Sequence, residues 1–91
     1  MQAEPEFVDA LNNLGIVYLT TGKHDKAVVQ FRQCLTKHQE NPVAHFNLGI
    51  ALKNLSRFGE ATEELELAIA HSAEESERAL RARALIAEMN S

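Results

Sequence analysis

The tetrapeptide Asn-Leu-Gly-Ile occurs twice in this chain, at residues 13–16 and again at residues 47–50. The same shift of 34 residues aligns residues 8–41 with residues 42–75. It also pairs Ala10 with Ala44, Ala27 with Ala61 and Glu40 with Glu74. A fixed period of this length is typical of repeat proteins, in which each repeat is one small motif that packs on its neighbours. The sequence therefore predicts two copies of one unit, between a lead-in of residues 1–7 and a final segment of residues 76–91.

Each unit has the pattern of two helices joined by a turn. Apolar residues recur at helical spacing in two blocks, and residues that favour turns separate the blocks at Gly22 and at 56–59. Asn41 is a suitable N-cap with Pro42 at the first helical position, and Pro5 is expected to open the first helix in the same way. We therefore expect an all-α fold built from antiparallel helix-turn-helix units.

Small residues occupy the same places in both units. Gly15 and Gly49 fall in the first helix, and Ala27 and Ala61 fall in the second. A glycine inside a helix costs about 1 kcal/mol relative to alanine. It is tolerated where two helices must approach closely. These positions predict that the two helices of each hairpin are in tight contact.

The period, the two Asn-Leu-Gly motifs and the later Ala and Phe31/Leu65 positions resemble tetratricopeptide repeats. The similarity covers residues 8–75 as two full repeats, and residues 76–91 resemble the solvating helix that closes such arrays. The resemblance implies a short right-handed α-solenoid of about five helices. His45 departs from the family, which often has a bulky aromatic residue there.

The length and composition fit a single small domain and favour helix. The chain has 91 residues, with 9 Lys+Arg against 13 Asp+Glu and a net charge of −4, which disfavours nucleic acid and anionic membranes as ligands. It has one cysteine, no basic and apolar leader, and no apolar run of about 18 residues. We expect a cytoplasmic protein without a membrane segment.

Residues that could support catalysis or bind a metal are few. Cys34 and His38 share a helical face, but two ligands do not complete a zinc site, so we interpret Cys34 as a packing residue and expect no metal, no cofactor and no enzymatic activity. We expect His24, His45 and His71 to lie in turns, between helices or at the surface. The acidic residues Glu60, Glu63, Glu64 and Glu66 are interpreted as a solvated helix face.

The resemblance also implies where a partner binds. In this family the first helices of the repeats line a concave groove that takes a peptide or a helix of another protein. The matching residues are Asp9, Asn12, Asn13, Ile16, Leu19 and Thr20 in the first repeat, Val43, Phe46, Asn47, Ile50, Lys53 and Asn54 in the second, and Arg81 in the final segment. Two alternatives stay open: Asn13 and Asn47 could instead hydrogen-bond across the repeat interface, and Phe46 and Ile50 could be buried under the last helix.

One class of ligand is disfavoured. Co-chaperones of this family grip the acidic C-terminal tail of a chaperone with lysine, asparagine and arginine side chains. The matching positions here are Asn12, Ile16, Asn47, Glu77 and Arg81, of which only Asn47 and Arg81 fit. Without the two lysines the charge complementarity to a carboxylate is largely lost.

The final segment has two apolar stripes. Ala79, Ala82, Leu85, Ile86 and Met89 form one that can cover the second repeat, and Leu80, Ala84 and Ala87 form a weaker one that is suited to another subunit or to the groove. Ser72 with Glu75 resembles a capping box and favours a helix break there. The alternative is one continuous helix over residues 60–91 in a domain-swapped dimer.

These patterns lead to two functional hypotheses. The first is a protein-interaction module that binds a partner peptide or helix in its groove. The second is a self-assembling structural module whose groove and last helix mediate homo-oligomerisation.

Overall fold

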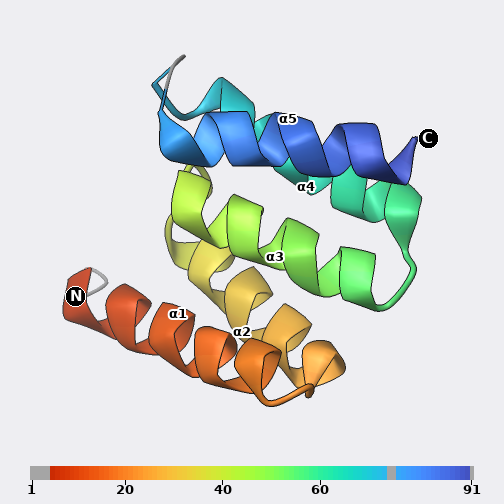
Figure 1. Cartoon of the computed structure of the whole chain (residues 1–91). Helices are drawn as coiled ribbons and strands as arrows, with labels where there is room; N and C mark the ends of the chain where they lie inside the picture. Colours follow the sequence, from red (N-terminus) through yellow and green to blue (C-terminus); the bar gives the residue numbers. More distant parts are fainter. Residues whose placement is uncertain (1–4, 74–75, 91) are drawn as a thin grey trace.

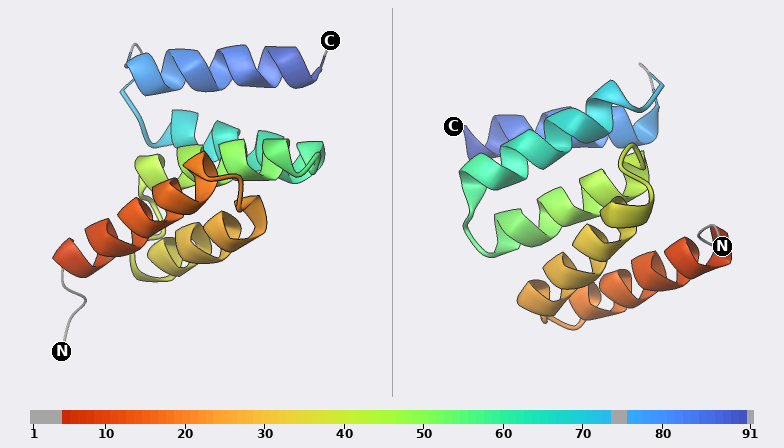
Figure 2. Two further views of the ribbon diagram at one scale, coloured as in Figure 1. Left: turned by 60° about the horizontal axis from the view of Figure 1, so that its bottom comes forward. Right: turned by 180° about the vertical axis from the view of Figure 1, so that it is seen from behind.

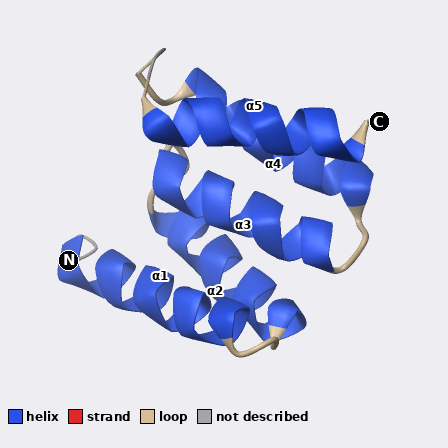
Figure 3. Cartoon of the chain, in the orientation of Figure 1, coloured by secondary structure: helices blue, strands red, loops and turns tan. Residues whose placement is uncertain are grey.

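A computed structural model describes residues 5–73 and 76–90 of the chain. In these residues the chain is built from helices joined by short connections, and it contains no β-strand (Figure 3). The helices are α1 (Pro5–Thr20), α2 (His24–Lys37), α3 (Pro42–Asn54), α4 (Phe58–Ala70) and α5 (Glu77–Met89) (Figure 1). The prediction of an all-α fold with about five helices is confirmed.

The helices stack in chain order. α1 pairs with α2 and α3 pairs with α4 as two hairpins, α2 packs on α3, and α5 packs on α4. The views from the front and from behind show two layers, with α1, α3 and α5 in one and α2 and α4 in the other (Figure 2). α1 and α5 lie at opposite ends of the stack (Figure 1). This stack of helix-turn-helix units is the predicted repeat architecture.

The helix boundaries follow local signals in the sequence. Asn41 caps α3, because its Oδ1 accepts hydrogen bonds from the backbone amides of Val43 at 2.9 Å and Ala44 at 3.2 Å. Gly22 ends the α1–α2 turn with a φ of 83°, which glycine adopts without steric cost. Ser56, at the equivalent place in the second hairpin, also has a positive φ, of 63°.

The break before α5 was predicted correctly, but its cap was not. α4 ends at Ala70 and α5 begins at Glu77, so the alternative of one continuous helix is wrong. The Oγ of Ser72 donates to the carbonyl of Ala68 at 2.6 Å and closes α4. Ser76, and not Ser72, is the N-cap of α5, accepting from the Ala79 amide at 3.1 Å. Glu75, the other half of the expected capping box, lies outside the described residues.

The two glycines mark the tightest helix contacts. A methyl group on Gly49 would lie 2.7 Å from Cγ of Leu65 and 3.3 Å from the carbonyl oxygen of Ala61. A methyl group on Gly15 would lie 2.5 Å from Cε1 of Phe31. Both Leu65 and Phe31 are fully buried. The predicted close approach of the paired helices is therefore confirmed, and it is made by one large residue inserted against a glycine.

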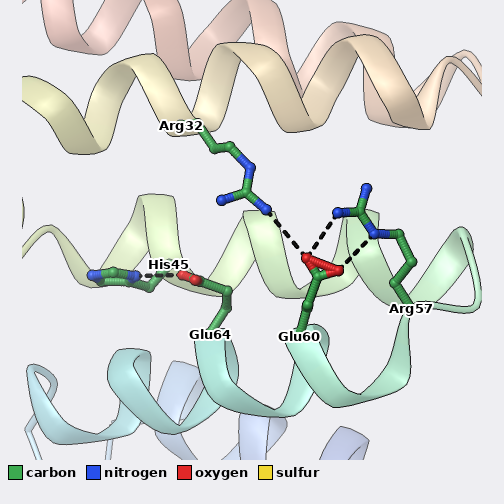
Figure 4. A network of polar contacts seen from close by, with 5 residues as sticks. All are labelled: Arg32, His45, Arg57, Glu60 and Glu64. Atoms are coloured by element: carbon green, nitrogen blue, oxygen red, sulfur yellow. Dashed lines mark hydrogen bonds and ion pairs between the residues drawn. The ribbon is translucent and has the colours of Figure 1, made fainter.

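His45 connects α3 to α4 and to the segment before α3, and Figure 4 shows its contact with Glu64. The His45 side chain is buried, with Nδ1 2.7 Å from Oε1 of Glu64 on α4 and Nε2 2.8 Å from the carbonyl oxygen of Gln39 before α3. A carbonyl oxygen only accepts, so Nε2 donates a hydrogen bond to the carbonyl oxygen of Gln39. Nδ1 forms a second hydrogen bond with the carboxyl group of Glu64. The ring also stacks on that of His71, with centroids 6.0 Å apart. A polar cluster thus occupies the place for which the family often uses an aromatic side chain.

The acidic face of α4 is more than a solvated surface. Glu63 and Glu66 are exposed as predicted, and Glu60 pairs with two arginines while its side chain stays 45% exposed. The solvated-face interpretation is wrong only for Glu64, which is half-buried against His45. Arg57 donates to Glu60 from Nε at 2.8 Å and from Nη2 at 2.7 Å, and Arg32 of α2 lies 3.6 Å from the same carboxylate. The Arg57 hydrogen bonds hold the pKa of Glu60 below its usual range, with a further contribution from Arg32.

We predict that Gly49→Leu lowers the free energy of unfolding by about 3 kcal/mol or more, because the new side chain must displace the buried Leu65. The measurement is urea unfolding followed by circular dichroism. Gly59→Ala is the matched control: Gly59 is an exposed helical residue whose added methyl group would meet no atom within 4 Å. It should raise stability by about 0.4 to 1 kcal/mol. A Gly49→Leu protein as stable as the wild type would contradict the close-contact account.

We also predict that His45→Leu and Glu64→Leu each cost about 1 to 3 kcal/mol, because each leaves polar atoms without a partner. The double variant should lose less than the sum of the single variants by at least about 0.5 kcal/mol, since neither partner is then left alone. A double-mutant cycle from urea unfolding measures this difference. Strictly additive losses would show that the two side chains are not energetically coupled.

Candidate functional site

The predicted groove residues all lie on the layer formed by α1, α3 and α5. α3 contacts α1 on one side and α5 on the other, so residues far apart in the sequence become neighbours (Figure 1). Asn12, Asn13, Ile16 and Leu19 come from α1, Phe46, Asn47, Ile50, Lys53 and Asn54 come from α3, and Arg81 comes from α5. The candidate groove residues thus lie on three helices of one layer.

The asparagines form one contact between the repeats. Nδ2 of Asn47 donates to Oδ1 of Asn12 at 3.4 Å, and both side chains are half-buried. The alternative of a hydrogen bond across the repeat interface therefore holds for Asn47, with Asn12 as its partner. Asn13 is exposed beside this pair. A carboxamide has two N–H donors and an acceptor oxygen, so the pair keeps capacity for a ligand backbone.

The apolar part of the surface is smaller than the sequence suggested. Ile16 and Leu19 are half-buried against the core between the two hairpins, and Ile50 is half-buried against the core under α5. Phe46 has only 7% of its surface exposed, because it packs with Leu65, Ala68 and Ala82. The alternative that α5 covers Phe46 is correct, so Phe46 offers an edge and not an open face.

A hollow of about 380 Å³ lies between the N-terminal halves of α3 and α5. Its lining consists of Val43, Phe46, Asn47, Ser76, Glu77, Arg78 and Arg81. The guanidinium carbon of Arg81 lies 5.6 Å from the centroid of the Phe46 ring, within cation–π range. Sequence reasoning assigned no groove role to Ser76 or Arg78. The signal for Arg78 is its position one helical turn before Arg81.

The other end of the surface carries paired charges. Nζ of Lys53 lies 3.8 Å from a carboxylate oxygen of Glu88, which joins α3 to α5. Asn54 is exposed at the C-terminal end of α3. The surface therefore offers hydrogen-bonding groups, small apolar areas and charges of both signs.

Cys34 is a packing residue, as the sequence suggested. The side chain is fully buried, and Sγ donates to the backbone carbonyl of Val8 at 3.5 Å. Burial raises the pKa of the thiol, and the nearby charge of Asp9 raises it further. His38 is exposed at the C-cap of α2.

Within residues 5–73 and 76–90 no three His, Cys, Asp or Glu side chains are grouped so that they could hold a metal ion. No helix in the described part of the chain is both long and apolar enough to cross a membrane.

We predict that the native Cys34 thiol reacts with a thiol-specific disulfide reagent at least about tenfold more slowly than the thiol of the urea-unfolded chain at the same pH. The physical reason is that burial both blocks access and, by raising the pKa, reduces the thiolate fraction. The rate is measured from the absorbance of the coloured thiol that the reagent releases when Cys34 attacks its disulfide. Equal rates in the folded and unfolded states would contradict the buried position.

A family model described as tetratricopeptide repeat matches residues 18–86, which is more than half of the chain. The searches of curated proteins and of solved structures give no match. The matched residues include α2, α3 and α4 completely, together with the last part of α1 and most of α5. The chain belongs to the tetratricopeptide repeat family.

Proposed function

We propose that this chain is a protein-interaction module that binds a peptide or a helix of a partner protein on the groove formed by α1, α3 and α5. Tetratricopeptide repeats in general mediate protein–protein interaction and are not enzymes. The observation that supports this surface most directly is the placement of Asn12, Asn13 and Asn47 together, with Ile16 and Ile50 on the same helices one turn further along.

The chemistry of the groove suits an extended backbone. Carboxamides can donate to a backbone carbonyl and accept from a backbone N–H, so they hold a peptide without reading its side chains. Selectivity then comes from the half-buried Ile16, Leu19 and Ile50 and from the hollow beside Arg78 and Arg81. We expect the partner segment to be extended, with apolar side chains and with a stretch that carries no charged side chain.

An acidic chaperone tail is not the ligand that we propose. Of the positions that grip such a tail, only Asn47 and Arg81 carry a suitable side chain. The two lysines that would complement the charge of a carboxylate are absent from the matching positions.

The organisation of the module follows from the hairpins. We assign residues 8–41 and 42–75 to two repeats and residues 76–91 to a closing segment, because α1–α2 and α3–α4 pair as hairpins and α5 covers α4. The free, buried Cys34 fits a reducing compartment, so we place the module in the cytoplasm.

The second candidate function is self-assembly through the groove and α5. The observation in its favour is that Leu80, on the outer side of α5, has 55% of its surface exposed, with the exposed Ala84 and Ala87 beside it. Self-assembly differs from partner binding because it predicts that identical chains cover the groove.

We predict that peptides selected from a random display library against the whole chain bind the α1–α3–α5 surface. Amide chemical-shift changes on titration should centre on Asn13, Ile16 and Ile50, and the double variant Asn13→Ala/Ile50→Asp should raise Kd about tenfold or more. Since Asn13 is exposed and Ile50 only half-buried, the fold should persist, which circular dichroism checks.

Gln33→Ala is the matched control, because Gln33 is exposed on α2 in the opposite layer. It should leave Kd unchanged. Shift changes centred on α2 and α4, or an unaltered Kd for the groove variant, would contradict the proposed function.

A further inference from the structure

Two arginines line the hollow between α3 and α5 without a carboxylate partner. Among the described residues, neither Arg78 nor Arg81 forms an ion pair. Two other arginines of the chain are paired, because Arg32 and Arg57 both lie against Glu60. The hollow therefore presents guanidinium groups with open donor capacity, in a chain whose net charge is −4.

The ring of Phe46 positions one of these guanidinium groups. The guanidinium carbon of Arg81 lies 5.6 Å from the centroid of this ring, and the ring itself is buried against α4 and α5. A cation–π contact leaves the guanidinium N–H groups available for hydrogen bonds. Arg78 precedes Arg81 by three residues on α5 and lines the same hollow. The two side chains thus bring several N–H donors to one place.

The charges of the lining select the kind of anion. The lining has two positive charges, from the arginines, and one negative charge, from the exposed Glu77. A carboxylate carries a single negative charge and matches the difference. A phosphate monoester carries about −1.5 to −2 at pH 7 and would be repelled more strongly by Glu77. The hollow is therefore better suited to a carboxylate than to a phosphorylated side chain.

The hollow also has an apolar wall, which is formed by the half-buried Val43 and the edge of Phe46 on α3. Methylene groups of a side chain can lie against such a wall while its charged end reaches polar groups. The volume of about 380 Å³ compares with about 30 Å³ for one water molecule in the liquid, so a whole side chain fits. Glutamate combines two methylene groups with a carboxylate and suits both parts of the lining.

We propose that this hollow binds one glutamate side chain from within the partner segment, with its carboxylate paired to Arg78 and Arg81. The proposal rests on the proposed function, because the hollow lies between α3 and α5 in the same layer as the groove (Figure 1). Hydrogen bonds between a guanidinium and a carboxylate are short and about twice as strong as neutral ones. The glutamate is internal to the segment and fixes the register in which the adjoining uncharged stretch meets the asparagines.

The test is a double-mutant cycle across the complex, measured as Kd by calorimetry. Peptides selected from the display library against the whole chain are synthesised with an amidated C-terminus. They should contain a glutamate whose replacement by glutamine raises Kd about tenfold. With the Arg78→Gln/Arg81→Gln protein the same replacement should change Kd less than about twofold, because the charge partner is gone. Arg78→Gln alone leaves Arg81 over Phe46, should also reduce the effect, and covers the case in which the double variant fails to fold.

Arg83→Gln is the matched control, because Arg83 is exposed on the same helix but outside the lining of the hollow. It should preserve the tenfold effect of the peptide glutamate.

Five results would overturn the proposal and leave the proposed function intact. They are groove binding by peptides without a glutamate, equal Kd for the glutamate and glutamine peptides, an undiminished effect in the double arginine variant, loss of the effect in Arg83→Gln, and tighter binding when phosphoserine replaces the glutamate. Binding only by peptides with a free C-terminal carboxylate would overturn it as well, since the chain end would then be the ligand. Peptides that do not bind the α1–α3–α5 surface at all would overturn both this proposal and the proposed function.

Discussion

The structure depends on the contact between a glycine in one helix and a large buried residue in the next. Leu65 reaches the backbone of α3 only because Gly49 has no side chain, and Phe31 reaches α1 past Gly15 in the same way. Each contact sets the distance between the two helices of a hairpin. That distance in turn fixes how the hairpins stack, because α2 must then fit both α1 and α3. The two contacts thus set how α1 lies on α2 and how α3 lies on α4, while α5 is placed by its packing on α4.

The second repeat adds a polar contact that the first repeat lacks. His45 joins Gln39, before α3, to Glu64 of α4, whereas the equivalent residue of the first repeat is the apolar Leu11. Buried polar groups are costly when unpaired and specific in geometry when paired. The cluster therefore fixes the entry of the chain into α3 and the rotation of α4 against it. Since α3 is the central helix of the candidate groove, this contact also holds the candidate residues of α3 in place.

Much of the fold could be predicted from the sequence, because the sequence signals that determine it are local. The 34-residue period, the Asn41-Pro42 helix start and the small residues each act within one or two helices, and each is confirmed. The polar contacts were less readable, because their partners lie on different elements: Glu64 meets His45, and Glu60 meets Arg32 of α2. The cap of α5 was misplaced by one turn, since two serines at 72 and 76 can both cap and only packing selects between them. Among the candidate groove residues, the pairing of Asn47 with Asn12 and the choice between an open and a covered Phe46 depend on how neighbouring helices pack.

We expect the two glycine contacts to make α3 and its neighbours the most stable part of the stack, and the candidate groove lies on this part. Native-state amide hydrogen exchange measured by NMR tests this residue by residue. The account predicts the slowest exchange in α3 around Leu48 to Leu52 and in the facing turns of α2 and α4, with faster exchange in α1 and α5. Slowest exchange in α5 or α1, or equal protection in all five helices, would contradict it.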